Sequence, residues 1–252
     1  MILVTGGHWW LAVLHAGLIA LAAWTNKGGD DRFRRVTGDL LPLIAAPLLY
    51  GELPLLIAAV GTTYHDPTIQ AWELRLFGTQ PSRTFAARFP FMSVSELLHG
   101  GYLGYYLVIF IPPLVLLARG ERRGFGETVL ALTIAYTVCW SLFIAFPVEG
   151  PRYLWGAPPG IPNGPMRRLA AGILAAGSSR GAAFPSSHMA ISVTQAMMAW
   201  RWQRKVGWVL WLVTFLVGFG AVYGGFHYAV DILAGAALGA VVASSVIATS
   251  NH

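Results

Sequence analysis

Long apolar stretches alternate with short polar segments along the chain, and charged residues mark the boundaries between them. Residues 1–26 contain no Asp, Glu, Lys or Arg, 22 uncharged residues separate Glu96 from Arg119, and 21 separate Glu127 from Glu149. An α-helix needs about 20 predominantly apolar residues to cross the hydrocarbon core of a bilayer. Each of these stretches therefore predicts a membrane-spanning helix.

The same pattern predicts seven spans along the chain. We place them near residues 8–24, 40–64, 97–118, 128–148, 185–202, 205–223 and 227–248. The expected fold is an all-α polytopic membrane protein with six core helices and one N-terminal transmembrane helix. We expect that helix and its cytoplasmic loop to occupy residues 1–37, and the core domain to occupy residues 38–252.

Two segments are too polar to be spans. Residues 65–94 mix charged residues with Trp72 and Leu76, which is typical of an amphipathic segment in the membrane interface. Residues 148–184 contain five prolines and four arginines. Because a loop of this length is usually functional or disordered, we expect this one to border the active site.

Composition excludes a soluble domain. Only 11% of the 252 residues are charged and 56% are hydrophobic, whereas a soluble domain carries about 25% charged residues. The net charge of +6 comes from short basic clusters between apolar spans, which favours juxtamembrane positions over a nucleic-acid partner. The single cysteine, Cys139, forms no intrachain disulfide and does not indicate a compartment.

The distribution of basic residues predicts the orientation. Ten of the 17 Lys and Arg residues lie in loops 25–37, 119–125 and 201–205, so we expect these loops to be cytoplasmic. Residues 65–94 and 148–184 then lie on the extracytoplasmic face. A high content of Ala, Gly and Arg suggests a GC-rich genome, and hence a bacterial inner membrane.

Two motifs on that face carry the candidate chemistry, FPSSHMA at residues 184–190 and GGFHYAVDILAG at residues 224–235. His227 and Asp231 are four residues apart, which places them on one face of a helix. The carboxylate can then accept the proton of one imidazole nitrogen and leave the other nucleophilic. His188, in the first turn of the fifth span, is a second acid or base.

Other interpretations of these residues remain open. His227 and Asp231 could form a hydrogen bond that only stabilises the helix. Alternatively, the two histidines and the aspartate are plausible zinc ligands. Arg152 and Arg180 argue against a metal, because guanidinium groups repel a cation and suit a phosphate.

Small residues beside the histidines also suit an anion. Ser186 and Ser187 offer hydroxyl and backbone N–H groups at a helix N-terminus, which is a favourable anion site. Gly181, Gly224 and Gly225 would allow the backbone to approach a ligand closely.

These motifs resemble those of the type 2 phosphatidic acid phosphatase (PAP2) superfamily. FPSSH is similar to the P-S-x-H motif of that family, and HYAVD is similar to the H-x-x-x-D end of its third motif. The segments DPTIQAWELRLFGTQPS and FPVEGPRY resemble those of the inositolphosphorylceramide synthase and sphingomyelin synthase-like branch. The resemblance covers roughly residues 66–240.

The resemblance implies a role for each site residue. His227 would be the nucleophile that forms a phosphohistidine, and Asp231 would orient it. His188 would protonate the leaving alkoxide and then activate the acceptor. The oxygens of the phosphoryl group would be held by Ser186, Ser187, Arg152 and Arg180. Such enzymes use no metal and no cofactor, and their substrates are lipid phosphates such as a phospholipid or a polyprenyl phosphate.

The sequence departs from the phosphatase pattern at two positions. The K-x6-R-P motif is absent, with FPVEGPRY in its place, and Ala221 stands where the third motif has an arginine. Arg152 and Arg180 are our candidates for residues that supply the positive charges of these two missing family positions. Hydrolysis is our first expectation because it needs no second substrate site. The alternatives are headgroup transfer to a lipid alcohol and, from another class, a transporter without catalysis.

Overall fold

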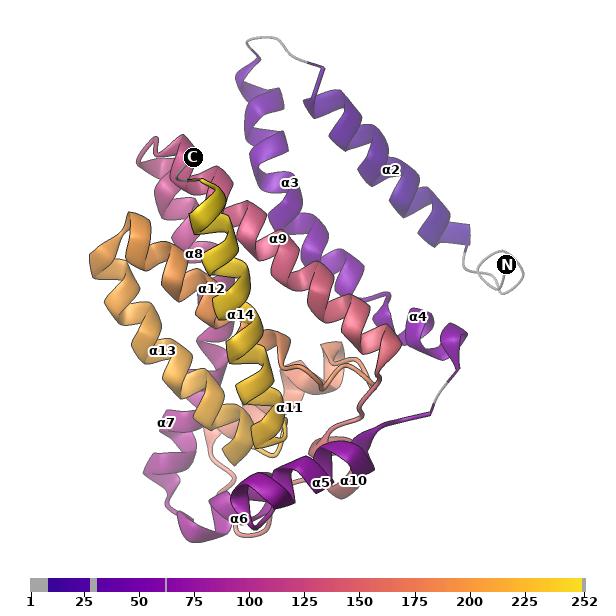
Figure 1. Cartoon of the computed structure of the whole chain (residues 1–252), viewed down its shortest axis with the longest axis vertical. Helices are drawn as coiled ribbons and strands as arrows, with labels where there is room; N and C mark the ends of the chain where they lie inside the picture. Colours follow the sequence, from indigo (N-terminus) through magenta and orange to yellow (C-terminus); the bar gives the residue numbers. More distant parts are fainter. Residues whose placement is uncertain (1–8, 28–30, 62, 251–252) are drawn as a thin grey trace. The chain divides into compact units, whose positions relative to one another are not determined.

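The computed structural model describes residues 9–27, 31–61 and 63–250, and these residues are organised as helices (Figure 1). The expected all-α fold is confirmed, since the described residues form no strand beyond an isolated bridge between Val148 and Ala182. The helices are α2 (Trp9–Thr25), α3 (Arg32–Tyr50), α4 (Leu53–Val60), α5 (Asp66–Phe77), α6 (Pro81–Arg88), α7 (Met92–Leu103), α8 (Tyr105–Ala118), α9 (Arg122–Ala145), α10 (Pro151–Trp155), α11 (Pro165–Gly177), α12 (Ser187–Trp202), α13 (Arg204–Tyr223) and α14 (Ala229–Thr249).

The chain divides into two compact units, Met1–Glu52 and Leu53–His252. The boundary predicted at residue 37 falls inside α3. In the first unit, α2 packs against α3, and the imidazole of His15 lies 2.9 Å from the carboxylate of Glu52. The second unit contains both histidine motifs.

Three helices of the described chain, α9, α13 and α14, are long and apolar enough to cross a membrane. Two further spans result if α3 with α4, and α7 with α8, each count as one broken span. The α7–α8 pair bends by 42° at Gly104, where a Cβ atom would lie 2.9 Å from the Val213 side chain. The protein is an integral membrane protein, and the count of seven spans stays a prediction.

Helix α12 is central to the second unit and packs against α8, α9, α13 and α14. Two glycines of α14 bring its backbone close to that of α12. A Cβ atom at Gly235 would lie 2.3 Å from the Ser186 carbonyl oxygen, and one at Gly239 would lie 2.3 Å from the Ala190 carbonyl oxygen. Small residues four apart allow this close approach, which brings the N-termini of α12 and α14 together.

Helices α5, α6 and α10 lie at the end of the second unit where α14 begins (Figure 1). The segment 148–184, expected to be a long loop, contains two helices, α10 and α11, each with a proline at its first position. Proline suits that position because its missing N–H has no helical partner there. We refer to residues 149–181 as the roof. Its α11 packs through Ala170 and Leu174 against Tyr102 and Ala221.

Candidate active site

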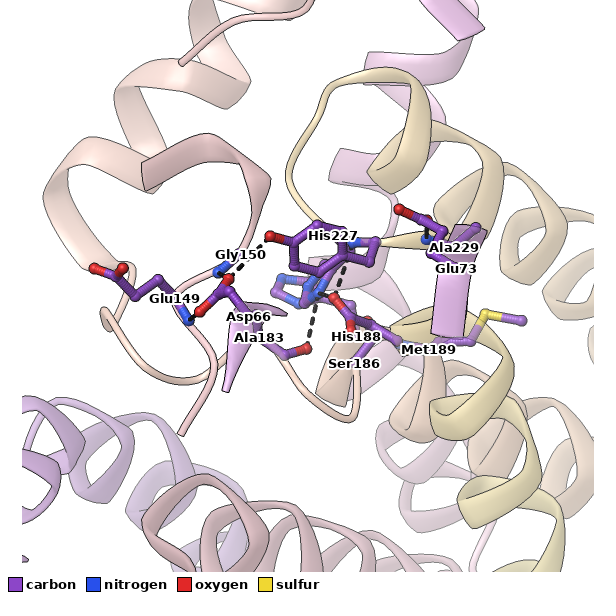
Figure 2. Close-up of polar contacts among 12 residues, drawn as sticks. Asp66, Glu73, Glu149, Gly150, Ala183, Ser186, His188, Met189, His227 and Ala229 are labelled. Carbon is purple, nitrogen blue, oxygen red and sulfur yellow. Dashed lines mark hydrogen bonds and ion pairs between the residues drawn. The ribbon is translucent and has the colours of Figure 1, made fainter. Parts of the chain in front are cut away.

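The imidazole of His227 is held through one ring nitrogen. Its Nδ1 lies 3.0 Å from the carbonyl oxygen of Ala183 and 3.3 Å from Oδ2 of Asp231 (Figure 2). Because both partners are acceptors, Nδ1 carries the proton, and Nε2 keeps its lone pair. His227 lies just before α14 rather than within it, since the helix begins at Ala229. Asp231 is fully buried and also accepts from the Tyr228 N–H at 2.9 Å.

His188 lies in the first turn of α12, with its ring centroid 5.8 Å from that of His227. The hydroxyl of Tyr102 lies 3.1 Å from Nε2 of His188, and the ring of Tyr105 lies 4.2 Å from the same imidazole. Nδ1 of His188 is buried and has no hydrogen-bond partner among the described residues. Nδ1 is therefore the nitrogen of His188 that remains for a substrate.

The two serines begin α12. The Ser186 hydroxyl caps the helix by accepting from the Met189 N–H at 3.3 Å, and the Ser186 N–H donates to the Asp231 carbonyl at 3.0 Å. The hydroxyl and the N–H of Ser186 thus both have protein partners, and a further contact from this hydroxyl to phosphate stays a prediction. Ser187 and His188 are the first residues of the helix, where N–H groups lack helical partners. These N–H groups are the ones that an anion would use.

The two arginines expected to bind phosphate make other contacts. Arg180 pairs with Glu149, and this carboxylate raises the pKa of the Arg180 guanidinium. Arg152 donates to the Leu174 carbonyl at 3.2 Å and lies over the ring of Tyr153. Both arginines thus contact other residues of the roof, Arg180 through Glu149 and Arg152 through Leu174 and Tyr153. Their binding of phosphate stays a prediction.

The space beside the glycines near the motifs is filled by other parts of the protein. Gly181 and Gly225 have positive φ angles of 95° and 68°. A Cβ atom at Gly181 would meet the side chain of Ile57 at 3.1 Å, and one at Gly225 would meet Pro158 at 2.7 Å. These two glycines therefore let the protein pack on itself, and their approach to a ligand stays a prediction.

Three residues that contact the site were not among its predicted residues. Tyr102 bonds to His188, and Asp66 and Glu73 of α5 bond to Tyr228 and Ala229, which follow His227. Asp66 and Glu73 lie in a segment interpreted as interfacial and as similar to the synthase-like branch, without a role for either residue. Their spacing of seven residues, which places both on one face of a helix, was the available signal.

No group of three or more His, Cys, Asp or Glu side chains within residues 9–27, 31–61 and 63–250 is placed to hold a metal ion. His188, which bonds to Tyr102, therefore does not join His227 and Asp231 in such a group. The expectation of a metal-independent site stays a prediction for experiment.

A family model described as the PAP2 superfamily matches residues 80–245. The chain belongs to the PAP2 superfamily. The PAP2 match begins just before α6 and includes His188, His227 and Asp231, whereas α5 precedes it. The inositolphosphorylceramide and sphingomyelin synthase-like branch of the superfamily stays a prediction.

Two known proteins are similar to parts of this PAP2 chain. The bacitracin transport permease protein BcrC of Bacillus licheniformis is 38% identical over 68 residues, which is 27% of this chain and 33% of that relative. The match thus spans about a third of the relative. The crystal structure of Aquifex aeolicus LpxE aligns with a TM-score of 0.49 and 19% identity, covering 65% of this chain and 91% of that chain.

Proposed function

We propose that this chain is a metal-independent lipid phosphatase that works through a phosphohistidine. Its active site would lie at the extracytoplasmic face of a bacterial inner membrane, where it would hydrolyse a lipid phosphate or diphosphate. The observation that carries the proposal is the pair of imidazoles. His227 is held through Nδ1 with Nε2 left nucleophilic, and the ring of His188 lies 5.8 Å away.

The reaction would proceed in two steps. Nε2 of His227 attacks the terminal phosphorus, the N–P bond forms and the bond from phosphorus to the leaving oxygen breaks, while protonated His188 gives its proton to that oxygen, which belongs to a lipid alkoxide or, from a diphosphate, to a lipid phosphate. Neutral His188 then takes a proton from water, the resulting hydroxide attacks phosphorus, and the N–P bond breaks to release phosphate. Asp231 stabilises the positive charge that develops on the His227 ring.

The acceptor decides between two members of the same reaction class. A lipid hydroxyl in place of water would make the chain a phospho-headgroup transferase with the same first step. We place hydrolysis first because it needs no second substrate site. The name of the Bacillus relative adds transport as a candidate from another class, and transport does not require a nucleophilic histidine.

A mass-resolved product assay on the purified protein tests these possibilities. Phosphatidic acid, a polyprenyl diphosphate and phosphatidylinositol are each offered with and without ceramide or diacylglycerol. We expect inorganic phosphate from the wild type and at least a 10³-fold loss of rate in His227→Ala, because nucleophile removal abolishes covalent catalysis. His15→Gln, in the first unit, is the matched histidine control and should retain the wild-type rate.

Other results of this assay would identify a different activity or contradict the mechanism. A new phospholipid that forms only with an acceptor identifies a transferase. A rate that EDTA removes and zinc restores identifies a metal hydrolase. Product formation at the wild-type rate by His227→Ala, or no product from any combination, contradicts the proposed mechanism.

A further inference from the structure

Helix α5 combines buried carboxylates with exposed apolar side chains. Its buried residues are Asp66, Ile69 and Glu73, which follow the three- and four-residue spacing of one helix face. Around and beyond this buried strip the helix exposes large apolar side chains, as expected for contact with lipid, namely Trp72, Leu74, Leu76 and Phe77. Because buried carboxylates are rare and destabilising unless they have partners, the inward-facing pair requires an explanation.

The Asp66 carboxylate joins two segments of the site. It accepts from the N–H groups of Glu149 and Gly150, at 2.8 and 2.9 Å, and from the hydroxyl of Tyr228 at 3.0 Å. Burial raises the pKa of Tyr228, so its hydroxyl stays protonated and donates. The same hydroxyl accepts from Gln70 at 3.0 Å. Asp66 therefore connects the residue after His227 to the start of the roof.

That part of the roof supports His227 from its other side. The Val148 carbonyl accepts from the Ala183 N–H at 3.0 Å, and a Cβ atom at Gly150 would lie 3.0 Å from that of Ala183. The Ala183 carbonyl is one of the two groups that hold Nδ1 of His227. Asp66 is thus linked to His227 on two sides, through the Tyr228 side chain and through the segment that positions the Ala183 carbonyl.

Glu73 holds the next residue along the chain. Its Oε1 accepts from the Ala229 N–H at 2.5 Å, at the N-terminus of α14, where a negative charge is favourable (Figure 2). Its Oε2 is buried and has no partner among the described residues. Burial is the main cause that raises the pKa of Glu73 to about 7; the hydrogen bond from Ala229 opposes this rise and the negative charge of Asp231 on α14 adds to it. In its charged form Glu73 therefore lowers the stability of the fold.

We propose that Asp66 and Glu73 are positioning residues of the active site, which hold Tyr228 and Ala229 so that the His227 imidazole keeps its orientation toward His188 and the phosphate ester. The effect on turnover rests on the proposed function. The negative charge of Glu73 also adds to that of Asp231 in stabilising the cationic ring of phosphorylated His227. Helix α5, which precedes the matched family region, then forms part of the catalytic apparatus.

The test compares Asp66→Asn, Glu73→Gln and Glu73→Ala with Glu121→Gln, an exposed acid at the other end of the unit. Asp66 accepts from three donors, and in Asp66→Asn the new amide N–H would face one of them and leave it without an acceptor. We therefore expect kcat to fall roughly 100-fold, with KM changed less than about twofold. Glu73→Ala should lose roughly tenfold in kcat, because the Ala229 N–H loses its acceptor. Glu121→Gln should match the wild type.

The pH dependence of Glu73→Gln separates positioning from simple structural support. Glu73 binds its proton more tightly in the folded protein than in the unfolded chain. Its contribution to the free energy of unfolding therefore falls as pH rises from about 4.5 to 7. We therefore expect Glu73→Gln to unfold at a higher temperature than the wild type at pH 8 and at the same temperature at pH 4.5. The same variant should turn over more slowly at pH 8, with a difference that vanishes below pH 6. A variant that is both more stable and equally active at pH 8 overturns the role of Glu73.

A measurement without substrate separates the two proposals. Histidine ¹⁵N spectra, with the His227 signal assigned by its absence from His227→Gln, should show a single tautomer protonated at Nδ1 in the wild type. In Asp66→Asn and Glu73→Ala the signal should broaden or show both tautomers. If the wild type has no His227-dependent turnover but these spectra change, the proposed function fails and the positioning role stands. Unchanged spectra in both variants overturn the positioning role.

Discussion

At the scale of single residues, the two histidines of the site are held through different nitrogens. His227 is bound at Nδ1 by Ala183 and Asp231, and His188 is bound at Nε2 by Tyr102. The nitrogen left for chemistry is therefore Nε2 in one ring and Nδ1 in the other. A carboxylate stabilises the cation on His227, whereas a neutral hydroxyl lets His188 change its protonation state during the reaction.

Replacing Tyr102 tests this difference. Tyr102→Phe removes the hydroxyl partner of Nε2 but keeps the ring that stacks on His188, so we expect kcat to fall by up to roughly tenfold, the value of one neutral hydrogen bond. Tyr106→Phe, on an exposed tyrosine of α8, is the matched control. Steady-state kinetics on the purified proteins measure the effect. Equal losses in both variants would contradict a specific role for Tyr102.

The residues that could be predicted from sequence are those whose partners are near in the chain. The His227–Asp231 contact could be predicted from their spacing of four residues, although His227 lies just before α14 and not on the helix face that this spacing assumes. The contact between Tyr102 and His188 joins residues 86 positions apart and depends on how α7 packs near α12. Arg180 lies only eight residues before His188, yet its guanidinium pairs with Glu149, since a nearby carboxylate decides where a long flexible side chain points.

At the scale of helices, the charged boundaries predicted where the long helices lie, whereas the interruptions were not predictable. The division of one expected span into α7 and α8 at Gly104 depends on the close approach of Val213 from α13, which no local pattern reveals. The roof was expected to be a loop because proline and glycine break helices. Two of its prolines, Pro151 and Pro165, instead occupy the first positions of helices α10 and α11.

The close contact between α12 and α14 should tolerate little added volume. In Gly239→Ala the new methyl group would meet the Ala190 carbonyl, which should lower the free energy of unfolding by about 1–3 kcal/mol and slow turnover by separating the helices of His188 and His227. Gly126→Ala on α9 is the control, because a Cβ atom there meets nothing within 4 Å. Thermal unfolding and kcat measure the two effects. A stable, fully active Gly239→Ala protein would contradict this account of the packing.

At the scale of the whole molecule, the histidine motifs, the roof and α5 gather at one end of the second unit, while the other end carries basic residues. There, Glu127 accepts from Arg123 at 2.9 Å and from Trp202 at 3.1 Å. The site end also carries arginines, but in longer segments, and the positive-inside rule applies to short loops; we therefore predict that the short basic loops 119–125 and 201–205 face the cytoplasm and that the site faces outward.

Cysteine labelling tests that orientation. The native Cys139 is fully buried, so a membrane-impermeant maleimide should report only introduced cysteines. We expect Ala157→Cys, exposed in the roof, to label in intact cells, and Glu121→Cys, exposed between α8 and α9, to label only after the membrane is permeabilised. The reverse pattern would place the active site on the cytoplasmic face.

The pairing of Val148 with Ala182 has a consequence for how such proteins diversify. The roof leaves and rejoins the rest of the chain at neighbouring backbone positions, so its closure does not depend on the residues within it. His188, His227 and Asp231 all lie outside this insert, whereas its α11 covers Tyr102 beside His188. We expect an exchange of residues 151–181, which keeps the Glu149 and Gly150 N–H groups bound to Asp66, to alter which lipid is accepted and to leave these three side chains in place.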